Sequence, residues 1–224
     1  MDTSPVTIRK DVAALAQDNL VVKYHGKISL SENCPIPYAL RSESNNQKKL
    51  AIAKAALPLL EKARSIALDS GTTTSIFANE LLTLPPMNIV TNSLAVANVL
   101  LTSEHDVSLT GGQLSGHSKC LIGPDTEEYL SRVKTDYAFI SCTGIRDGVG
   151  LCTGMRLEAS VKKALLKAGI RVVALIDDSK FFTTSMFVFA DFSEINILVT
   201  NREVENLDCI RRIQDMGVQV IFAD

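Results

Sequence analysis

Short apolar runs alternate with helical patterns along this chain from Leu50 onward, and this alternation constrains the fold more than any other feature of the sequence. Each run has the length and the apolar character of a buried strand, and turn-forming residues separate it from the next segment. The predicted strands cover residues 65–68, 88–91, 107–110, 137–142, 172–176, 195–200 and 218–222.

The segments between these strands have the periodicity of amphipathic helices. The predicted helices cover residues 73–82, 94–101, 126–133, 158–168 and 203–216. An earlier helix is expected over residues 45–57, and Pro58 should end or bend it because proline lacks a backbone N–H. Strands that alternate with helices indicate an α/β fold, so we expect a mostly parallel open sheet with helices on both faces.

Polar or glycine-containing segments follow five consecutive predicted strands. In an open parallel sheet, ligands bind beyond the carboxyl ends of the strands. One such segment is typical of a solvated turn, whereas five in succession indicate a single pocket at one edge of the sheet. The segments lie at residues 69–73, 91–93, 110–112, 143–144 and 177–180.

The first of these segments has the sequence DSGTTT at residues 69–74 and precedes a predicted helix. The first backbone N–H groups of a helix have no intrahelical partner, and the helix dipole favours a negative charge there. Gly71 permits close backbone approach, and the neighbouring hydroxyls can bind phosphate oxygens. The segment therefore predicts either a phosphate site or an ordinary strand-to-helix turn capped by serine or threonine.

Residues 1–30 differ in character from the rest of the chain. Ser4 is a candidate helix N-cap, and Pro5 occupies the first helical position, where its missing N–H is tolerated. The apolar residues of this helix fall on one face, namely Ile8, Val12 and Leu15. Residues 20–28 then predict a small hairpin or wing, and the polar, proline-containing stretch 31–46 predicts a linker.

Composition excludes several classes of protein. The net charge of −2 argues against a surface coated with nucleic-acid-binding charge, and residues 1–30 carry only four basic against three acidic residues. The five cysteines form no CxxC pair and follow no signal peptide, which indicates free thiols in a reducing cytoplasm. The three histidines have no ligand-like neighbours, so we expect neither a metal nor another cofactor. No apolar run reaches membrane-spanning length.

Ordered motifs along nearly the whole chain resemble the DeoR family of bacterial transcriptional regulators. Residues 7–12 and 24–26 resemble that family's recognition helix and wing. The later motifs follow in the family's order and lie at residues 69–73, 91–94, 111–112, 123, 144, 150–151, 158–164 and 177–181.

The resemblance implies three segments: a partial winged helix-turn-helix at residues 1–30, a linker at 31–46 and an effector-binding sensor domain at 47–224. It implies that the sensor domain has the fold of ribose-phosphate isomerases and CoA transferases. The sequence begins just before the matched helix, and Lys27 stands where the family has a second glycine. We therefore expect a truncated DNA-binding domain, which puts operator binding by this polypeptide alone in doubt.

The resemblance further implies a regulator, in the first instance a repressor, of sugar metabolism whose effector is a phosphorylated sugar. The phosphate is expected to bind Ser70, Gly71, Thr72 and Thr73. Asp69 is expected to orient a sugar hydroxyl or its own loop, since like charges repel.

Other polar positions complete the predicted ligand site. Asn92 and Ser93 either bind sugar hydroxyls or cap the next helix. The glycines Gly111, Gly112 and Gly144 are expected at the pocket wall, with a tight turn as the alternative for the first two.

Charged side chains are the last part of this site. Glu158 and Lys162 lie four residues apart and so share a helix face, as an ordinary surface pair would. The resemblance favours a pocket-facing position in which Lys162 meets an anionic ligand, and Lys180 adds a second positive charge.

For operator DNA, the matched positions are Thr7, Arg9 and Lys10, because arginine reads guanine edges while lysine and threonine hold phosphates. A solvated amphipathic helix is the competing interpretation.

The resemblance also implies a homodimer or homotetramer. The competing function is a phosphosugar isomerase or deaminase with Glu158 as base, but no second positioned acid is evident, so no catalytic residue is assigned.

Overall fold

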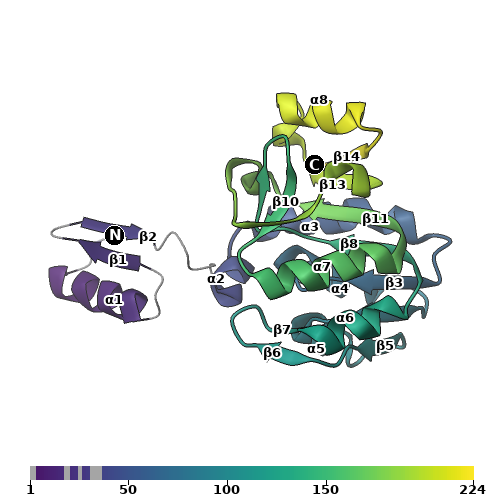
Figure 1. The fold of residues 1–224 in the computed structure, drawn as a ribbon, viewed down its shortest axis with the longest axis horizontal. Helices are drawn as coiled ribbons and strands as arrows, with labels where there is room; N and C mark the ends of the chain where they lie inside the picture. The colour runs from purple at the N-terminus through teal and green to yellow at the C-terminus, as the bar shows by residue number, and fades with distance from the viewer. Residues whose placement is uncertain (1–3, 18–20, 25–26, 31–36) are drawn as a thin grey trace. The chain divides into compact units, whose positions relative to one another are not determined.

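The computed structural model describes residues 4–17, 21–24, 27–30 and 37–224, and the chain forms two compact units, Met1–Pro37 and Tyr38–Asp224 (Figure 1). The first unit contains α1 (Pro5–Gln17), β1 (Val21–Tyr24) and β2 (Lys27–Leu30). The Ser4 hydroxyl accepts a hydrogen bond from the Thr7 N–H at 3.2 Å, so Ser4 caps α1 as expected.

β1 and β2 pair antiparallel, which confirms the predicted hairpin. The apolar face of α1 is left partly exposed, at 49% for Ile8 and 37% for Leu15. The predicted wing residues His25 and Gly26, and residues 31–36 of the predicted linker, lie outside the described residues.

In the described part of the second unit, seven parallel strands form the central sheet. In their order across the sheet, they are β14 (Gln219–Ala223), β13 (Ile197–Asn201), β11 (Gly169–Ile176), β8 (Thr135–Ile140), β3 (Ser65–Leu68), β4 (Asn88–Thr91) and β5 (Asp106–Leu109). The chain first builds outward from β3 to β5, then returns to β8 and builds outward on the other side. The strand order therefore reverses between β3 and β8, and such a reversal opens a crevice for ligands at the carboxyl ends.

Helices cover both faces of this sheet (Figure 1). One face packs against α3 (Asn46–Ala56), α4 (Thr72–Leu81) and α5 (Leu94–Leu100), through residues such as Ile52, Phe77 and Val96. The other packs against α6 (Pro124–Ser131), α7 (Arg156–Ala168) and α8 (Asp208–Asp215). The central strands β8 and β11 contribute to both cores, which explains their nearly continuous apolar sequences.

The predicted α/β fold is thus confirmed, and all seven predicted strands belong to the sheet with ends shifted by up to three residues. The helix expected over residues 203–216 is interrupted, because extended backbone at Leu207 separates η4 (Arg202–Val204) from α8. After α3, the chain tightens into η1 (Leu57–Leu60), which contains Pro58, so the proline bends the chain as expected.

Five short antiparallel strands escaped the sequence interpretation because three or four residues are too few to show alternation. β6 (Gln113–Ser115) pairs with β7 (Cys120–Ile122), and β10 (Gly150–Thr153) pairs with both β9 (Gly144–Arg146) and β12 (Phe187–Ala190).

A further helix, α2 (Tyr38–Glu43), lies within the stretch expected to be linker. It belongs to the second unit, because Tyr38 is buried and its hydroxyl donates to Ser75 at 2.7 Å.

Candidate functional site

The carboxyl ends of β3 and β8 meet where the strand order reverses, and Asp69 and Ser141 follow these two strands. The Ser141 N–H donates to the Asp69 carboxylate at 3.0 Å, and the Asp69 N–H donates to the Phe139 carbonyl at 3.0 Å. The Ser70 N–H also donates to this carboxylate, at 2.6 Å. Asp69 thus orients the two loops, which is one of the roles expected from the sequence.

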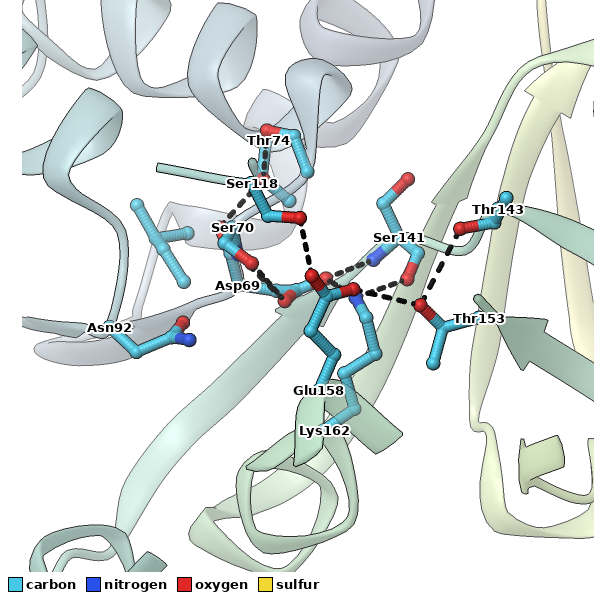
Figure 2. A network of polar contacts seen from close by, with 12 residues as sticks. Asp69, Ser70, Thr74, Asn92, Ser118, Ser141, Thr143, Thr153, Glu158 and Lys162 are labelled. Carbon is cyan, nitrogen blue, oxygen red and sulfur yellow. Dashed lines mark hydrogen bonds and ion pairs between the residues drawn. The ribbon is translucent and has the colours of Figure 1, made fainter. Parts of the chain in front are cut away.

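Lys162 reaches this point from α7 (Figure 2). Its ammonium group forms an ion pair with Asp69 and donates to the Ser141 carbonyl at 2.9 Å. Both side chains are almost fully buried. Removing two charges from water is unfavourable, so such a pair requires the additional hydrogen bonds seen here. Lys162 therefore faces the site, with its charge matched by Asp69.

Glu158 lies one helical turn before Lys162 and joins two further segments to the site (Figure 2). Its carboxylate accepts hydrogen bonds from Ser118, in the turn between β6 and β7, and from Thr153 at 3.0 Å, at the end of β10. Glu158 and Lys162 thus make separate contacts inside the protein, unlike a surface ion pair.

These residues surround a small cavity of about 10 Å³, lined by Arg41, Ser70, Gly71, Ser118, Ser141, Cys142, Thr143, Thr153, Glu158 and Lys162. A cavity of this size holds about one water molecule. Burial raises the pKa of the Cys142 thiol to about 12, so this cysteine is a neutral wall residue at physiological pH. Within the described residues, no group of three or more histidine, cysteine, aspartate or glutamate side chains could hold a metal ion.

α4 begins at the cavity wall without a side-chain cap. The hydroxyl of Thr74 turns back to the Asp69 and Gly71 carbonyls, at 2.8 and 2.7 Å. In the described structure, no acceptor satisfies the N–H groups of Thr72 and Thr73. The start of this helix therefore offers free donors and a positive dipole end.

Gly71 is required where α4 begins. A Cβ atom at this position would lie 2.6 Å from the Ser141 Cβ, so a side chain would separate the two loops.

The segment after β4 lies beside this cluster and makes contacts of its own. The Ser93 hydroxyl accepts a hydrogen bond from the Val96 N–H at 3.2 Å. Ser93 thus caps α5, which was the predicted alternative to binding a sugar hydroxyl. Asn92 donates to the Leu121 carbonyl at 3.0 Å, while its carbonyl oxygen is buried with no hydrogen-bond partner in the described structure. Figure 2 places Asn92 to one side of the cluster.

The other predicted glycines do not line the cavity. Gly112 has a φ of +127°, and Thr126 donates to the Gly111 carbonyl at 2.7 Å, so this pair forms a tight turn that seats α6. Gly144 begins β9, and a Cβ there would lie 2.4 Å from the Thr183 carbonyl oxygen. Its role is close backbone packing beside the site.

Lys180 is half-buried within η2 (Asp178–Phe182), which follows β11. It is not among the residues that line the cavity, so the structure does not bring this predicted positive charge into the site. Asp177 accepts from the Ser179 N–H at 3.2 Å and so caps its own turn.

Sequence reasoning missed five lining residues: Arg41, Ser118, Ser141, Cys142 and Thr153. Ser141 was assigned to the preceding strand, which ends at Ile140. Arg41, Ser118 and Thr153 lie on α2 and the short hairpins, so no strand-end signal pointed to them.

The predicted DNA-binding residues Thr7, Arg9 and Lys10 lie on α1 and are exposed. Across the described residues, no helix combines the length and apolar character needed to cross a membrane.

The comparisons with known proteins agree on one family. The family model described as the DeoR C terminal sensor domain matches residues 44–202. The glycerol-3-phosphate regulon repressor of Escherichia coli (strain K12) is 30% identical over 200 residues, which cover 88% of this chain and 79% of the repressor. The L-fucose operon activator of Haemophilus influenzae is 32% identical over 206 residues, covering 91% of this chain and 82% of the activator.

Among solved structures, ribose 5-phosphate isomerase A from Methanocaldococcus jannaschii is similar with a TM-score of 0.46 and 20% identity. The match covers 61% of this chain and 55% of the isomerase.

Proposed function

Because the chain belongs to the DeoR family of transcriptional regulators, we propose that its second unit senses a phosphorylated sugar and thereby controls the transcription of sugar-metabolism genes. The names of its relatives, which include a glycerol-3-phosphate regulon repressor, support both parts of this proposal. A repressor is the first form proposed, while the fucose operon activator shows that relatives also activate.

The observation that carries the sensor proposal is the uncapped start of α4 at the wall of a cavity that Arg41 and Lys162 also line. Unsatisfied N–H groups at a helix N-terminus bind phosphate readily. The buried Lys162 neutralises Asp69, so the carboxylate does not repel an anion beside it. We assign the phosphate to residues Ser70–Thr73 and the sugar hydroxyls to the surrounding polar groups.

The DNA-binding part of the proposal rests on α1. Its exposed residues Thr7, Arg9 and Lys10 are the candidates for operator contacts. Assembly as a homodimer or homotetramer would present such helices in pairs, as a palindromic operator requires.

A thermal-shift screen against phosphorylated sugars and their unphosphorylated parents tests the sensor proposal. A ligand present at a hundred times its Kd stabilises the folded state by about 2.7 kcal/mol, which raises Tm by a few degrees. We expect a shift only with a phosphosugar, and its loss in the Thr72→Ala/Thr73→Ala variant. No shift with any sugar phosphate would contradict the proposal.

The same compounds separate a sensor from an enzyme. Glu158, the candidate base, accepts two hydrogen bonds from Ser118 and Thr153, and Lys162 is paired with Asp69. We expect saturable binding without formation of an isomer or release of ammonia. Turnover of a bound phosphosugar would instead establish an isomerase or deaminase.

A further inference from the structure

Two cavities of very different size lie beside the start of α4. The small cavity described above has a volume of about 10 Å³, whereas an open pocket of about 410 Å³ lies between α2, α4 and α5. Sites for small molecules typically enclose about 300–1,000 Å³. The small cavity therefore cannot hold a whole phosphosugar, and the open pocket is large enough.

The two cavities are neighbours. Three pairs of adjacent residues divide between them, with the first member of each pair on the small cavity and the second on the open pocket: Arg41 and Ser42, Gly71 and Thr72, and Ser118 and Lys119. The wall between the cavities is thus formed by α2, the start of α4 and the turn between β6 and β7.

Three hydrogen bonds hold this wall in place, and we refer to them as the latch. The Tyr38 N–H donates to the His117 carbonyl at 3.1 Å, and the Tyr38 hydroxyl donates to Ser75 at 2.7 Å. Ser118, the residue after His117, donates a hydrogen bond to Glu158. The latch therefore ties α2 to the β6–β7 turn and ties that turn to Glu158, which lines the small cavity.

The far end of α2 is anchored separately. The buried Lys49 of α3 donates to the Arg41 and Ser44 carbonyls, both at 2.6 Å. These carbonyls lie at the carboxyl end of the short helix, which would otherwise leave them unsatisfied. Opening the latch would therefore swing α2 about its Lys49 end and leave α3 in place.

The open pocket has the chemistry of a site for an anionic polyol. Its lining includes two carboxamides, Asn79 and Asn98, and one cation, Lys119, but no carboxylate. Lys119 has a φ of +51°, in the left-handed region that non-glycine residues rarely adopt, and its ammonium lies 5.3 Å from the Tyr38 ring centroid.

We propose that the latch opens to join the two cavities, and that the phosphorylated sugar binds across the joined site. The inference rests on the function proposed above and adds Lys119, Asn79 and Asn98 to the ligand-binding residues. The phosphate binds at the start of α4, and the sugar extends into the open pocket.

Hydrogen exchange of the full chain without any sugar tests the latch independently of the proposed function. In Ser118→Ala, we expect the amides of residues 38–43 and 116–119 to exchange about tenfold faster, because a hydrogen bond to a carboxylate is lost. Ser131→Ala is the matched control, since it removes a hydroxyl that bonds only the Glu128 carbonyl. Tyr38→Phe keeps the ring and removes one latch bond, so it provides a second, milder variant. Unchanged exchange in both latch variants would overturn the proposal.

Binding of a phosphosugar identified in the screen tests the joined site. Lys119→Met should weaken binding about tenfold, as expected for loss of a charge-assisted contact, while the exposed Lys163→Met should not. Tyr38→Phe should strengthen binding about threefold, because less free energy is needed to open the latch. Wild-type affinity in Lys119→Met would reject the joined site. If no sugar phosphate binds the wild-type chain, the proposed function fails while the exchange result still decides the latch.

Discussion

At the scale of single residues, the site depends on buried charges whose partners come from distant parts of the chain. Lys162 pairs with Asp69, and Glu158 accepts from Ser118 and Thr153. Residue type and spacing placed Glu158 and Lys162 on one helix face, and the structure confirms that arrangement. Their partners could not be deduced in the same way, because spacing on one helix carries no information about what packs against it.

Loss of the buried ammonium should strongly destabilise the fold. Lys162→Met leaves the Asp69 carboxylate buried without a counter-ion, so we expect the free energy of unfolding to fall by about 3–5 kcal/mol. Lys163→Met alters the exposed neighbour on the same helix, and it should change the free energy of unfolding little. Urea unfolding of both variants measures the difference. A loss below about 1 kcal/mol in Lys162→Met would mean that the pair contributes no more than a surface ion pair.

Lys49 should make stability depend on pH. Burial lowers the pKa of Lys49 to about 8, from 10.5, although Asp177 nearby raises it. Below pH 8, both the folded and unfolded chains carry the proton. Between about pH 8 and 10.5 the unfolded chain binds more protons, so the free energy of unfolding should rise with pH across this range.

Comparison with Lys49→Met isolates this contribution, because the other titrating groups are shared. The difference between the two unfolding free energies should grow in favour of the wild type from pH 8 to pH 10. Lys54→Met changes an exposed position of the same helix, so its free energy of unfolding should instead vary with pH in parallel with that of the wild type. Parallel curves for Lys49→Met as well would show that Lys49 is not desolvated.

At the scale of elements, the turn from β3 into α4 must approach the loop after β8 very closely. Gly71→Ala would place a methyl group 2.6 Å from the Ser141 Cβ. We expect it to lower the free energy of unfolding by about 1–3 kcal/mol through overpacking, and to weaken phosphosugar binding because the α4 start shifts. Gly116→Ala is the control, since a Cβ there meets no atom within 4 Å. Equal stability of the two variants in chemical denaturation would refute the close-approach argument.

The long elements were predictable because their periodicities are local. The central strands of the sheet are continuous apolar runs, and the helices between them repeat their apolar residues at helical spacing. The short elements β6, β7, β9, β10 and β12 were not predictable, and they carry Ser118 and Thr153 to the site. α2 was assigned to a linker because its surroundings are polar and contain prolines, and its stability depends on tertiary contacts through Tyr38 and Lys49.

At the scale of the whole molecule, the second unit contains both hydrophobic cores. The earliest residue in either core is Ala51, partly buried on α3, so the described part of the first unit contributes nothing to them. A chain of residues 37–224 should therefore unfold cooperatively, with a Tm within about 2 °C of the full chain. Differential scanning calorimetry checks this. A markedly lower Tm for the shorter chain would show that the two units stabilise each other.

The sequence by itself determined the α/β class, the seven strands of the sheet and the polar segments at their carboxyl ends, because each depends on residues close together in the chain. Only the tertiary structure decided which of those segments meet. The reversal of strand order places Asp69 beside Ser141, and α7 then brings Lys162 to both. The segment after β5, which contains Gly111 and Gly112, forms a turn that seats α6, although its sequence predicted a part of the ligand site as much as the other segments did. Contacts between distant segments follow from strand order and packing, which local periodicity does not encode.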